Sequence, residues 1–124
     1  MHDYDAIAAD YIDAFNATDS ARRAKLVAAL FTEDVSYVDP MAEVAGHDGV
    51  GGFIAAAHAQ FPGWTFALAG SVDGHHDQAR FTWTLGPAGD EPPVQGFDVV
   101  SLDAAGKIKA VHGFLDKVPA ALAG

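Results

Sequence analysis

The sequence predicts an α+β domain whose helices come first and whose strands come later. Before residue 62, apolar side chains recur at helical spacing. After it, short runs of aromatic and β-branched residues are separated by Gly, Pro and Asp. This order is typical of α+β architecture. The 124 residues suit one domain over positions 1–124, since no repeat or linker interrupts them.

Three helices are expected in the first half of the chain. The first covers residues 5–16, the second follows capping residues at 17–20 and ends near residue 30, and the third covers about 47–60. The first and third each present one apolar stripe that should face the core. The stripe residues are Tyr4, Ile7, Ala8, Tyr11 and Phe15 in the first helix, and Val50, Phe53, Ile54, Ala57 and Phe61 in the third.

The strands are expected in two groups. A short strand over Val35–Val38 ends at Asp39-Pro40, and an irregular hairpin over Met41–Gly46 follows it. In the second half, four strand-like segments separated by turn residues predict an antiparallel meander. These segments are Trp64–Val72, Gln78–Leu85, Val94–Leu102 and Lys107–Leu115. A curved sheet of this kind, wrapped around a helix, leaves one pocket between its concave face and the helices.

Composition excludes several classes of function. The net charge is -10, and only seven basic residues are scattered along the chain, so neither nucleic acid nor an anionic membrane is an expected partner. The absence of cysteine rules out disulfides, zinc thiolate sites and cysteine nucleophiles. No apolar run approaches the roughly 20 residues that cross a bilayer, and the N-terminus lacks the features of a signal peptide. A soluble cytoplasmic protein is therefore expected.

The pair Asp39-Pro40 places a carboxylate at the end of a strand. Proline biases the preceding residue toward extended geometry, and Asp is a poor strand residue, so Asp39 should leave the strand at its mouth. A carboxylate in this place is a candidate general base. The alternative is an Asp-Pro turn, in which the side chain only binds nearby backbone.

Two further residues are candidates for chemistry. Asp98 lies mid-strand among apolar neighbours, where burial would raise its pKa and leave a protonated carboxyl that can donate a hydrogen bond. Alternatively, Asp98 pairs with Arg80 on the adjacent strand or faces solvent. Tyr11 lies on the inward stripe of the first helix, where it can also be an ordinary core tyrosine with a satisfied hydroxyl.

The order of these motifs resembles the ketosteroid isomerases, within the wider NTF2-like or SnoaL-like superfamily of cone-shaped α+β domains. The stretch Tyr-x-x-Ala-x-Asn-Ala-x-Asp begins at Tyr11, Asp39-Pro40 follows Leu-Phe-x-x-Asp, and Asp98 lies in the third of the late strands. The resemblance implies a curved antiparallel sheet wrapped around N-terminal helices, one internal pocket and a homodimer formed through the outer sheet face. It also implies that Asp39 is the base and that Tyr11 and protonated Asp98 form the oxyanion hole.

The resemblance further suggests which side chains contact an apolar substrate. By strand alternation Phe81, Trp83 and Leu85 share one face, which in this family lines the pocket. Plausible neighbours are Phe53, Phe61 and Val100. Trp83 is larger than the residue expected in steroid isomerases, so it should shrink the cavity and argues against a steroid-sized substrate.

The positions of the histidines and of Arg80 help to distinguish this chain from related enzymes with other activities. The adjacent His75 and His76 should point to opposite faces, and no His-x-x-x-His pair exists, so neither a metal site nor a cofactor is expected. If His76 or His112 lay near the pocket, the chain would resemble scytalone dehydratase. Limonene epoxide hydrolase has Arg and Asp two apart on one strand, whereas Arg80 is followed at that spacing by Thr82.

The leading hypothesis is a ketosteroid-isomerase-like enzyme. It would catalyse cofactor-independent proton transfer alpha to a carbonyl of an apolar small molecule. One alternative is a SnoaL-like polyketide cyclase that uses the same enolate chemistry, with Asp98 as the proton-transfer group. Another is a non-catalytic module that binds small ligands or dimerises, because fold does not determine function.

Overall fold

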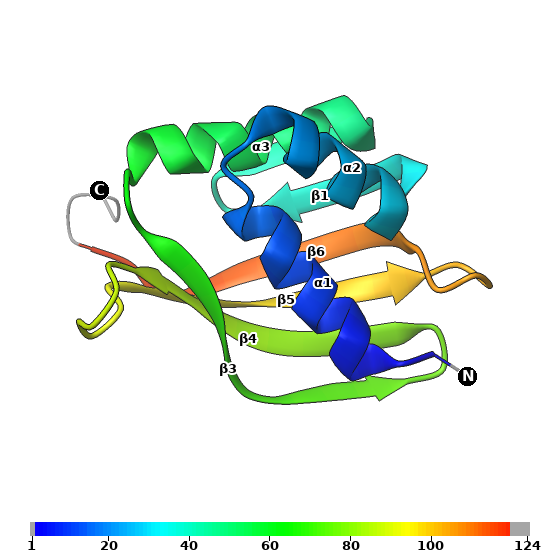
Figure 1. Cartoon of the computed structure of the whole chain (residues 1–124). Coiled ribbons are helices and arrows are strands. Elements are labelled where there is room, and N and C mark those ends of the chain that lie inside the picture. Colours follow the sequence, from blue (N-terminus) through cyan, green and yellow to red (C-terminus); the bar gives the residue numbers. More distant parts are fainter. Residues whose placement is uncertain (1, 120–124) are drawn as a thin grey trace.

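The computed structural model describes residues 2–119, which fold into three helices and one six-stranded sheet (Figure 1). The helices are α1 (Tyr4–Asn16), α2 (Ser20–Leu30) and α3 (Gly46–Gln60). The strands are β1 (Phe31–Asp39), β2 (Ala42–Ala45), β3 (Thr65–His75), β4 (Gln78–Gly86), β5 (Val94–Leu102) and β6 (Ile108–Lys117). The helices gather on one face of the curved sheet, and the other face is left bare of helices (Figure 1). The predicted α+β class is confirmed.

Helices α1 and α2 begin where the sequence offers side-chain caps, whereas α3 begins after Ala45 without one. The carboxylate of Asp3 accepts a hydrogen bond from the Ala6 amide at the start of α1, and Asp19 accepts one from the Arg22 amide at the start of α2. The predicted bounds of all three helices agree with the observed ones to within about two residues. Strand β1, however, starts directly after α2. Residues 31–34, which precede the strand expected over Val35–Val38, therefore belong to β1, whose register shifts between Phe31 and Ser36.

The sheet has the strand order β2-β1-β6-β5-β4-β3. Strands β3 to β6 form the predicted antiparallel meander. The irregular hairpin expected within Met41–Gly46 is instead the single strand β2, which pairs antiparallel with β1. The pairing of β1 with β6 is parallel, so the sheet is mixed and not wholly antiparallel. The direction of β6 is set by the turns of the meander before it, and these bring it alongside β1 in the same direction. Local sequence patterns contain no signal for such a long-range pairing.

Alternation along the strands separates an inner face under the helices from an outer face. Every second residue of β5, from Val94 to Leu102, is buried, and Asp98 belongs to this buried set. In β4 the side chains of Phe81 and Trp83 are likewise buried, whereas Arg80 is exposed. The core therefore lies between the helices and the inner face of the sheet.

Asn16 attaches the C-terminal end of α1 to the sheet. Its side-chain amide nitrogen donates to the carbonyl oxygen of Phe66 at 2.9 Å, and its side-chain oxygen accepts from the Phe66 amide at 2.7 Å. The side chain thus pairs with the backbone of β3 as a neighbouring strand would. This attachment holds α1 across the inner face and directs Tyr11 toward the centre of the sheet. No helix within residues 2–119 combines the length and apolarity needed to cross a membrane.

Candidate active site

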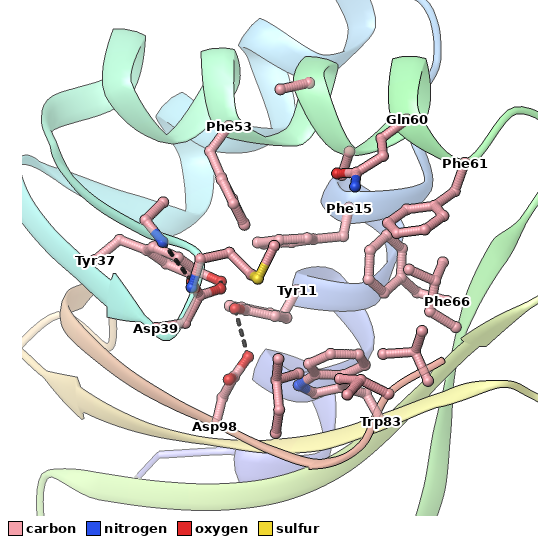
Figure 2. Close-up of a pocket in the computed structure, with 18 residues that line it drawn as sticks. Tyr11, Phe15, Tyr37, Asp39, Phe53, Gln60, Phe61, Phe66, Trp83 and Asp98 are labelled. Atoms are coloured by element: carbon pink, nitrogen blue, oxygen red, sulfur yellow. Dashed lines mark hydrogen bonds between the residues drawn. The ribbon is translucent and has the colours of Figure 1, made fainter. Parts of the chain in front are cut away.

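A pocket of about 330 Å³ lies between the helices and the inner face of the sheet (Figure 2). Most of its wall is apolar, and its carboxyl and phenol groups gather toward the strands β1 and β5. The lining residues are Tyr11, Phe15, Tyr37, Asp39, Met41, Ala42, Phe53, Ala56, Ala57, Gln60, Phe61, Phe66, Trp83, Leu85, Val94, Asp98, Leu115 and Val118. Tyr11, Asp39 and Asp98, far apart in the sequence, therefore line the same pocket.

Asp98 is a buried carboxyl that is paired with a phenol. Its side chain comes from the inner face of β5 and is 2% exposed, and the Tyr11 hydroxyl donates to its Oδ2 at 2.6 Å. Burial raises the pKa of Asp98 to about 6, and the charge of Asp39 also raises it. The Tyr11 hydroxyl and the Trp83 indole N–H act in the opposite direction. The indole N–H falls short of hydrogen-bond geometry, since Trp83 Nε1 and Asp98 Oδ1 both lack a partner.

Asp39 is held by three donors at the end of β1. Its Oδ1 accepts from the backbone amides of Met41 and Ala42 at 2.8 and 2.9 Å, which makes the Asp-Pro turn considered above. Its Oδ2 accepts from the Tyr37 hydroxyl at 2.5 Å. The turn interpretation and the pocket interpretation of Asp39 therefore both hold, because the turn fixes a carboxyl that also lines the pocket (Figure 2).

Both tyrosines are held in their donor form. Burial is the largest cause that raises the pKa of Tyr11 and of Tyr37 well above the ordinary value of 10.0, and the charges of Asp98 and Asp39 add to the effect. The hydroxyls therefore stay protonated, and each donates to a carboxyl. The polar end of the pocket consists of two phenol–carboxyl pairs, Tyr11 with Asp98 and Tyr37 with Asp39.

The two carboxyl groups approach each other above Gly113 of β6. A Cβ atom added to this glycine would lie 2.7 Å from Asp98 Oδ1 and 2.9 Å from Asp39 Cβ. Such distances are closer than real Cβ atoms tolerate, so even an alanine would displace one carboxyl or the other. The missing side chain at Gly113 leaves the space in which Asp39 and Asp98 converge.

The predicted apolar contacts are only partly at the pocket. Phe53, Phe61, Trp83 and Leu85 line it, but Phe81 and Val100 do not. Both are buried on the inner face, beyond the part of the sheet that borders the cavity. The Tyr11 ring packs edge-on against the Phe81 ring, with 5.0 Å between their centroids, so the cavity ends at Tyr11. Alternation predicts the face of a strand but not how far along it a pocket extends.

The basic side chains considered above lie away from the pocket. Arg80 pairs with Asp73 on the outer face at 3.3 Å and not with Asp98. His112 is exposed on the same face, where its register neighbours are Val38 and Val99, and His75 and His76 are exposed at the β3–β4 turn. Within residues 2–119, no group of three or more His, Asp or Glu side chains is arranged to hold a metal ion.

Two polar residues that line the pocket, Tyr37 and Gln60, are missed by sequence reasoning. Tyr37 belongs to the strand expected over Val35–Val38 and stands two residues before Asp39, so both side chains face the same side. The lining residues Phe15 and Phe66 were also not assigned to the pocket. Their helical and strand periodicity marks them as core, and it does not distinguish a packed core from a cavity wall.

The fold and pocket define an NTF2-like α+β domain. Residues 8–111 match the SnoaL-like domain family, and the chain belongs to this family. A candidate isomerase of the SnoaL-like family from Agrobacterium tumefaciens has a similar crystal structure, with 42% identity and a TM-score of 0.87 over 91% of this chain and 97% of that one. No curated protein sequence matches the chain.

More distant structures share the fold. An NTF2-like protein of unknown function from Exiguobacterium sp. 255-15 has 24% identity and a TM-score of 0.70, covering 89% of this chain and 98% of that one. A candidate polyketide cyclase from Sinorhizobium meliloti has 17% identity and a TM-score of 0.68, covering 86% of this chain and 92% of that one. At these identities the similarity establishes the architecture alone.

Proposed function

We propose that the protein is an enzyme of the ketosteroid isomerase type. It would move a proton alpha to a carbonyl group of an apolar small molecule without a cofactor. The observation that carries this proposal is the convergence of two phenol–carboxyl pairs at one end of a largely apolar pocket. The candidate isomerase from A. tumefaciens, at 42% identity, supports the same class of reaction.

In this reaction Asp39 is the base. Its carboxylate takes a proton from the carbon next to the carbonyl, the C–H electron pair forms a C=C bond, and the carbonyl oxygen becomes an enolate oxygen. The same carboxyl then returns the proton to carbon. Tyr37 and the two turn amides orient Asp39, so that one lone pair of Oδ2 remains directed toward the substrate.

The enolate oxygen needs donors that are already in position. Tyr11 and the protonated form of Asp98 provide them, once the oxygen replaces Asp98 as acceptor for the Tyr11 hydroxyl. The burial that raises the pKa of Asp98 to about 6 makes this protonated form accessible near neutral pH. Donor function of Asp98 is therefore expected to decline as pH rises above about 6.

A polyketide cyclase is the second candidate. The fraction of Asp98 that is ionised at neutral pH is a buried carboxylate, and such a group could itself take the proton during ring closure. The candidate cyclase from S. meliloti shares the fold. In this alternative Asp98, rather than Asp39, is the proton-transfer group.

The test is exchange of the α-hydrogens of 2-tetralone for deuterium in D₂O, followed by proton NMR. Its hydrogens next to the carbonyl group are of the kind that the proposed reaction transfers. The Asp39→Asn variant is expected to lose about 100-fold or more of the exchange rate, a typical contribution of a general base. The outer-face variant Asp73→Asn is the matched control and should exchange at the wild-type rate.

Each outcome assigns a different function. Exchange that survives Asp39→Asn but is lost in Asp98→Asn favours the cyclase assignment. Wild-type protein that catalyses no exchange, yet binds apolar ligands equally well as the double variant Asp39→Asn/Asp98→Asn, is a binding module. In both cases Asp39 is not the base and the leading proposal fails.

A further inference from the structure

We infer that Trp83 is a positioning residue for Asp98. Its indole N–H faces Oδ1 of the carboxyl and so assigns the carboxyl proton to Oδ2, the oxygen beside the Tyr11 hydroxyl. That this proton is offered to a ligand oxygen rests on the proposed function. The contact between Trp83 and Asp98 does not rest on it, and the contact can be measured without turnover.

Gly96 allows the indole to reach Asp98. Trp83 of β4 and Gly96 of β5 are register partners, and a Cβ atom added to Gly96 would lie 2.7 Å from Cζ2 and 3.2 Å from Cε2 of the indole. The indole therefore lies across the glycine, with the edge that carries Nε1 over β5. Asp98 follows two residues later on the same face of β5, so this edge of the ring lies beside its carboxyl.

The indole is enclosed in this orientation. Its residue is 9% exposed, and Phe66 packs edge-on against the ring with 5.7 Å between the centroids. Figure 2 shows the indole nitrogen on the side of Trp83 that faces Asp98. Trp83 Nε1 and Asp98 Oδ1 are both buried, and neither has a hydrogen-bond partner within residues 2–119. Unpaired buried polar atoms are costly, so a small movement that joins this donor to this acceptor stabilises the site.

The two oxygens of the Asp98 carboxyl have different surroundings. Oδ2 accepts from the Tyr11 hydroxyl at 2.6 Å, as the dashed line between them in Figure 2 marks. Oδ1 lies on the β6 side, where a Cβ atom added to Gly113 would be 2.7 Å away. A ligand oxygen that replaces Asp98 as the acceptor for Tyr11 therefore meets Oδ2, and only a proton on Oδ2 can be donated to it.

The indole N–H favours this placement of the proton. A proton on Oδ1 would face a second donor, whereas an unprotonated Oδ1 accepts a hydrogen bond from the indole. Donation to Oδ1 also polarises the carboxyl, which strengthens the hydrogen bond that Oδ2 gives to a ligand oxygen. Trp83 thus acts on the ligand through Asp98 and does not itself contact the reacting atoms.

The same contact affects the titration of Asp98. Burial is the largest cause that raises its pKa, the Tyr11 hydroxyl and the Trp83 N–H lower it, and the charge of Asp39 raises it. The register partners of Asp98 on β4 and β6, Phe81 and Gly113, do not titrate. The titratable residues that face the carboxyl are Tyr11 of α1 and Tyr37 and Asp39 of β1.

Trp83→Phe tests the contact, because it removes the N–H and keeps an aromatic ring against Phe66. The titration of Asp98 is followed by NMR of its ¹³C-labelled carboxyl carbon. The midpoint is expected at about pH 6 in the wild type and about 0.5 to 1 pH unit higher in the variant. A role in packing alone predicts the opposite sign, because a smaller side chain admits water beside the carboxyl.

A tryptophan analogue separates the N–H from the shape of the ring. In β-(3-benzothienyl)alanine a sulfur atom replaces the indole N–H, and the two fused rings remain. Because the chain has two tryptophans, the analogue can be placed at position 83 alone in a Trp64→Phe background. It should raise the midpoint as Trp83→Phe does, and it keeps the test available if Trp83→Phe does not fold.

Trp64→Phe alone is the matched control. Trp64 stacks on Phe61 with 4.7 Å between the ring centroids, and it is not among the described residues that line the pocket. Its variant should therefore titrate at Asp98 as the wild type does. Circular dichroism establishes folding for each protein.

Binding of 2-tetralone tests where the proton lies, because a ketone oxygen only accepts hydrogen bonds. Burial raises the pKa of Asp98 to about 6, so most of the carboxyl is protonated at pH 5. Isothermal titration calorimetry at this pH should show about threefold to tenfold weaker binding in the protein with the analogue than in Trp64→Phe.

Each outcome either supports or overturns the inference. A midpoint that is unchanged or lower in both replacements overturns it. A midpoint that rises without loss of 2-tetralone affinity also overturns it, because the N–H would then stabilise the carboxylate without assigning the proton. Failure of the wild type to bind 2-tetralone overturns it as well. If both results are as expected but Asp39→Asn still exchanges 2-tetralone, the proposed function fails and the positioning role of Trp83 stands.

Discussion

Asp98 and Asp73 are two aspartates that lie on opposite faces of one sheet. On the outer face, Asp73 pairs with Arg80 at 3.3 Å, and both side chains are about two-thirds exposed at 65% and 68%. On the inner face, Asp98 has no cation beside it and only the neutral Tyr11 hydroxyl as a hydrogen-bond donor. Water and Arg80 compensate the outer charge, whereas the inner charge is compensated only in part.

This difference shows that the buried Asp98, unlike Asp73, lowers the stability of the folded protein when it ionises. A carboxyl buried without a cation destabilises the fold when it ionises, and such groups are retained mainly where they have a function. The outer face contains the arginine and exposed histidine that suggested other reactions, yet none of these groups reaches the pocket. Chemistry is therefore expected from the inner face alone.

The largest effect that sharpens this comparison is expected from Asp98→Asn. An unfolded chain releases the Asp98 proton near the ordinary pKa of 3.8, but the folded protein holds it until about 6. Wild-type stability therefore falls as pH rises from about 4 to about 6, and the loss persists above that window. Asn cannot ionise, so at pH 7.5 the variant should be more stable by up to about 3 kcal/mol.

Urea unfolding at pH 4 and pH 7.5 measures this effect. The variant and wild type should differ much less at pH 4, where Asp98 is protonated in the folded state and only about half ionised in the unfolded chain. Taking the difference between the two proteins removes the titration of the other carboxyl groups, and Asp73→Asn serves as the outer-face control. A constant difference between pH 4 and pH 7.5 would refute the buried, cation-free description of Asp98.

The next largest effect is expected from Tyr37→Phe. This change removes the donor to Asp39 Oδ2 and leaves the two turn amides on Oδ1. The carboxyl can then turn away from the reacting carbon, so kcat for 2-tetralone exchange should fall about 10- to 100-fold while KM stays within about threefold. The ring still packs against Phe53, which preserves the fold.

Tyr4→Phe is the control for the loss of a phenol hydroxyl, because the Tyr4 hydroxyl donates to the His76 carbonyl oxygen far from the pocket. A double-mutant cycle separates orientation from a direct role. Adding Tyr37→Phe to Asp39→Asn should cost little more than Asp39→Asn alone. Additive losses would show that Tyr37 acts independently of Asp39.

The sequence allowed much of the fold to be predicted because the signals are local. Helical stripes, N-caps and turn residues predicted the helices and the meander, and the proline after Asp39 predicted where β1 ends. The parallel pairing of β1 with β6 depends on where the whole chain brings two distant strands together. No local pattern encodes it, and so it was not predicted.

The site was less predictable than the fold. Family order brought Tyr11, Asp39 and Asp98 to attention, and the structure places them around one pocket. Tyr37 could have been found by applying strand alternation backward from Asp39, since residues two apart share a face. Phe81 belongs to the packed core, whereas Trp83 lines the pocket. This difference depends on how α1 lies across the sheet, and only the tertiary structure shows it.

The smallest expected effect concerns the outer face, which we propose joins two copies of the chain. Phe97 and Phe114 stack there with 5.0 Å between ring centroids, and Phe114 is 51% exposed. A stacked aromatic pair with one exposed ring on a helix-free sheet face is typical of an interaction surface. Phe114→Ser should weaken self-association about 10-fold in sedimentation equilibrium without altering 2-tetralone exchange per chain.

Arg80→Gln is the matched control on the same face, because its exposed ion pair with Asp73 contributes at most about 1 kcal/mol. A wild-type protein that sediments as a monomer at every concentration would remove the proposed dimer. Loss of exchange activity in Phe114→Ser would contradict the separation of the two faces. It would mean that association through the outer face shapes the pocket on the inner one, and the chemistry could then no longer be ascribed to the inner face of a single chain.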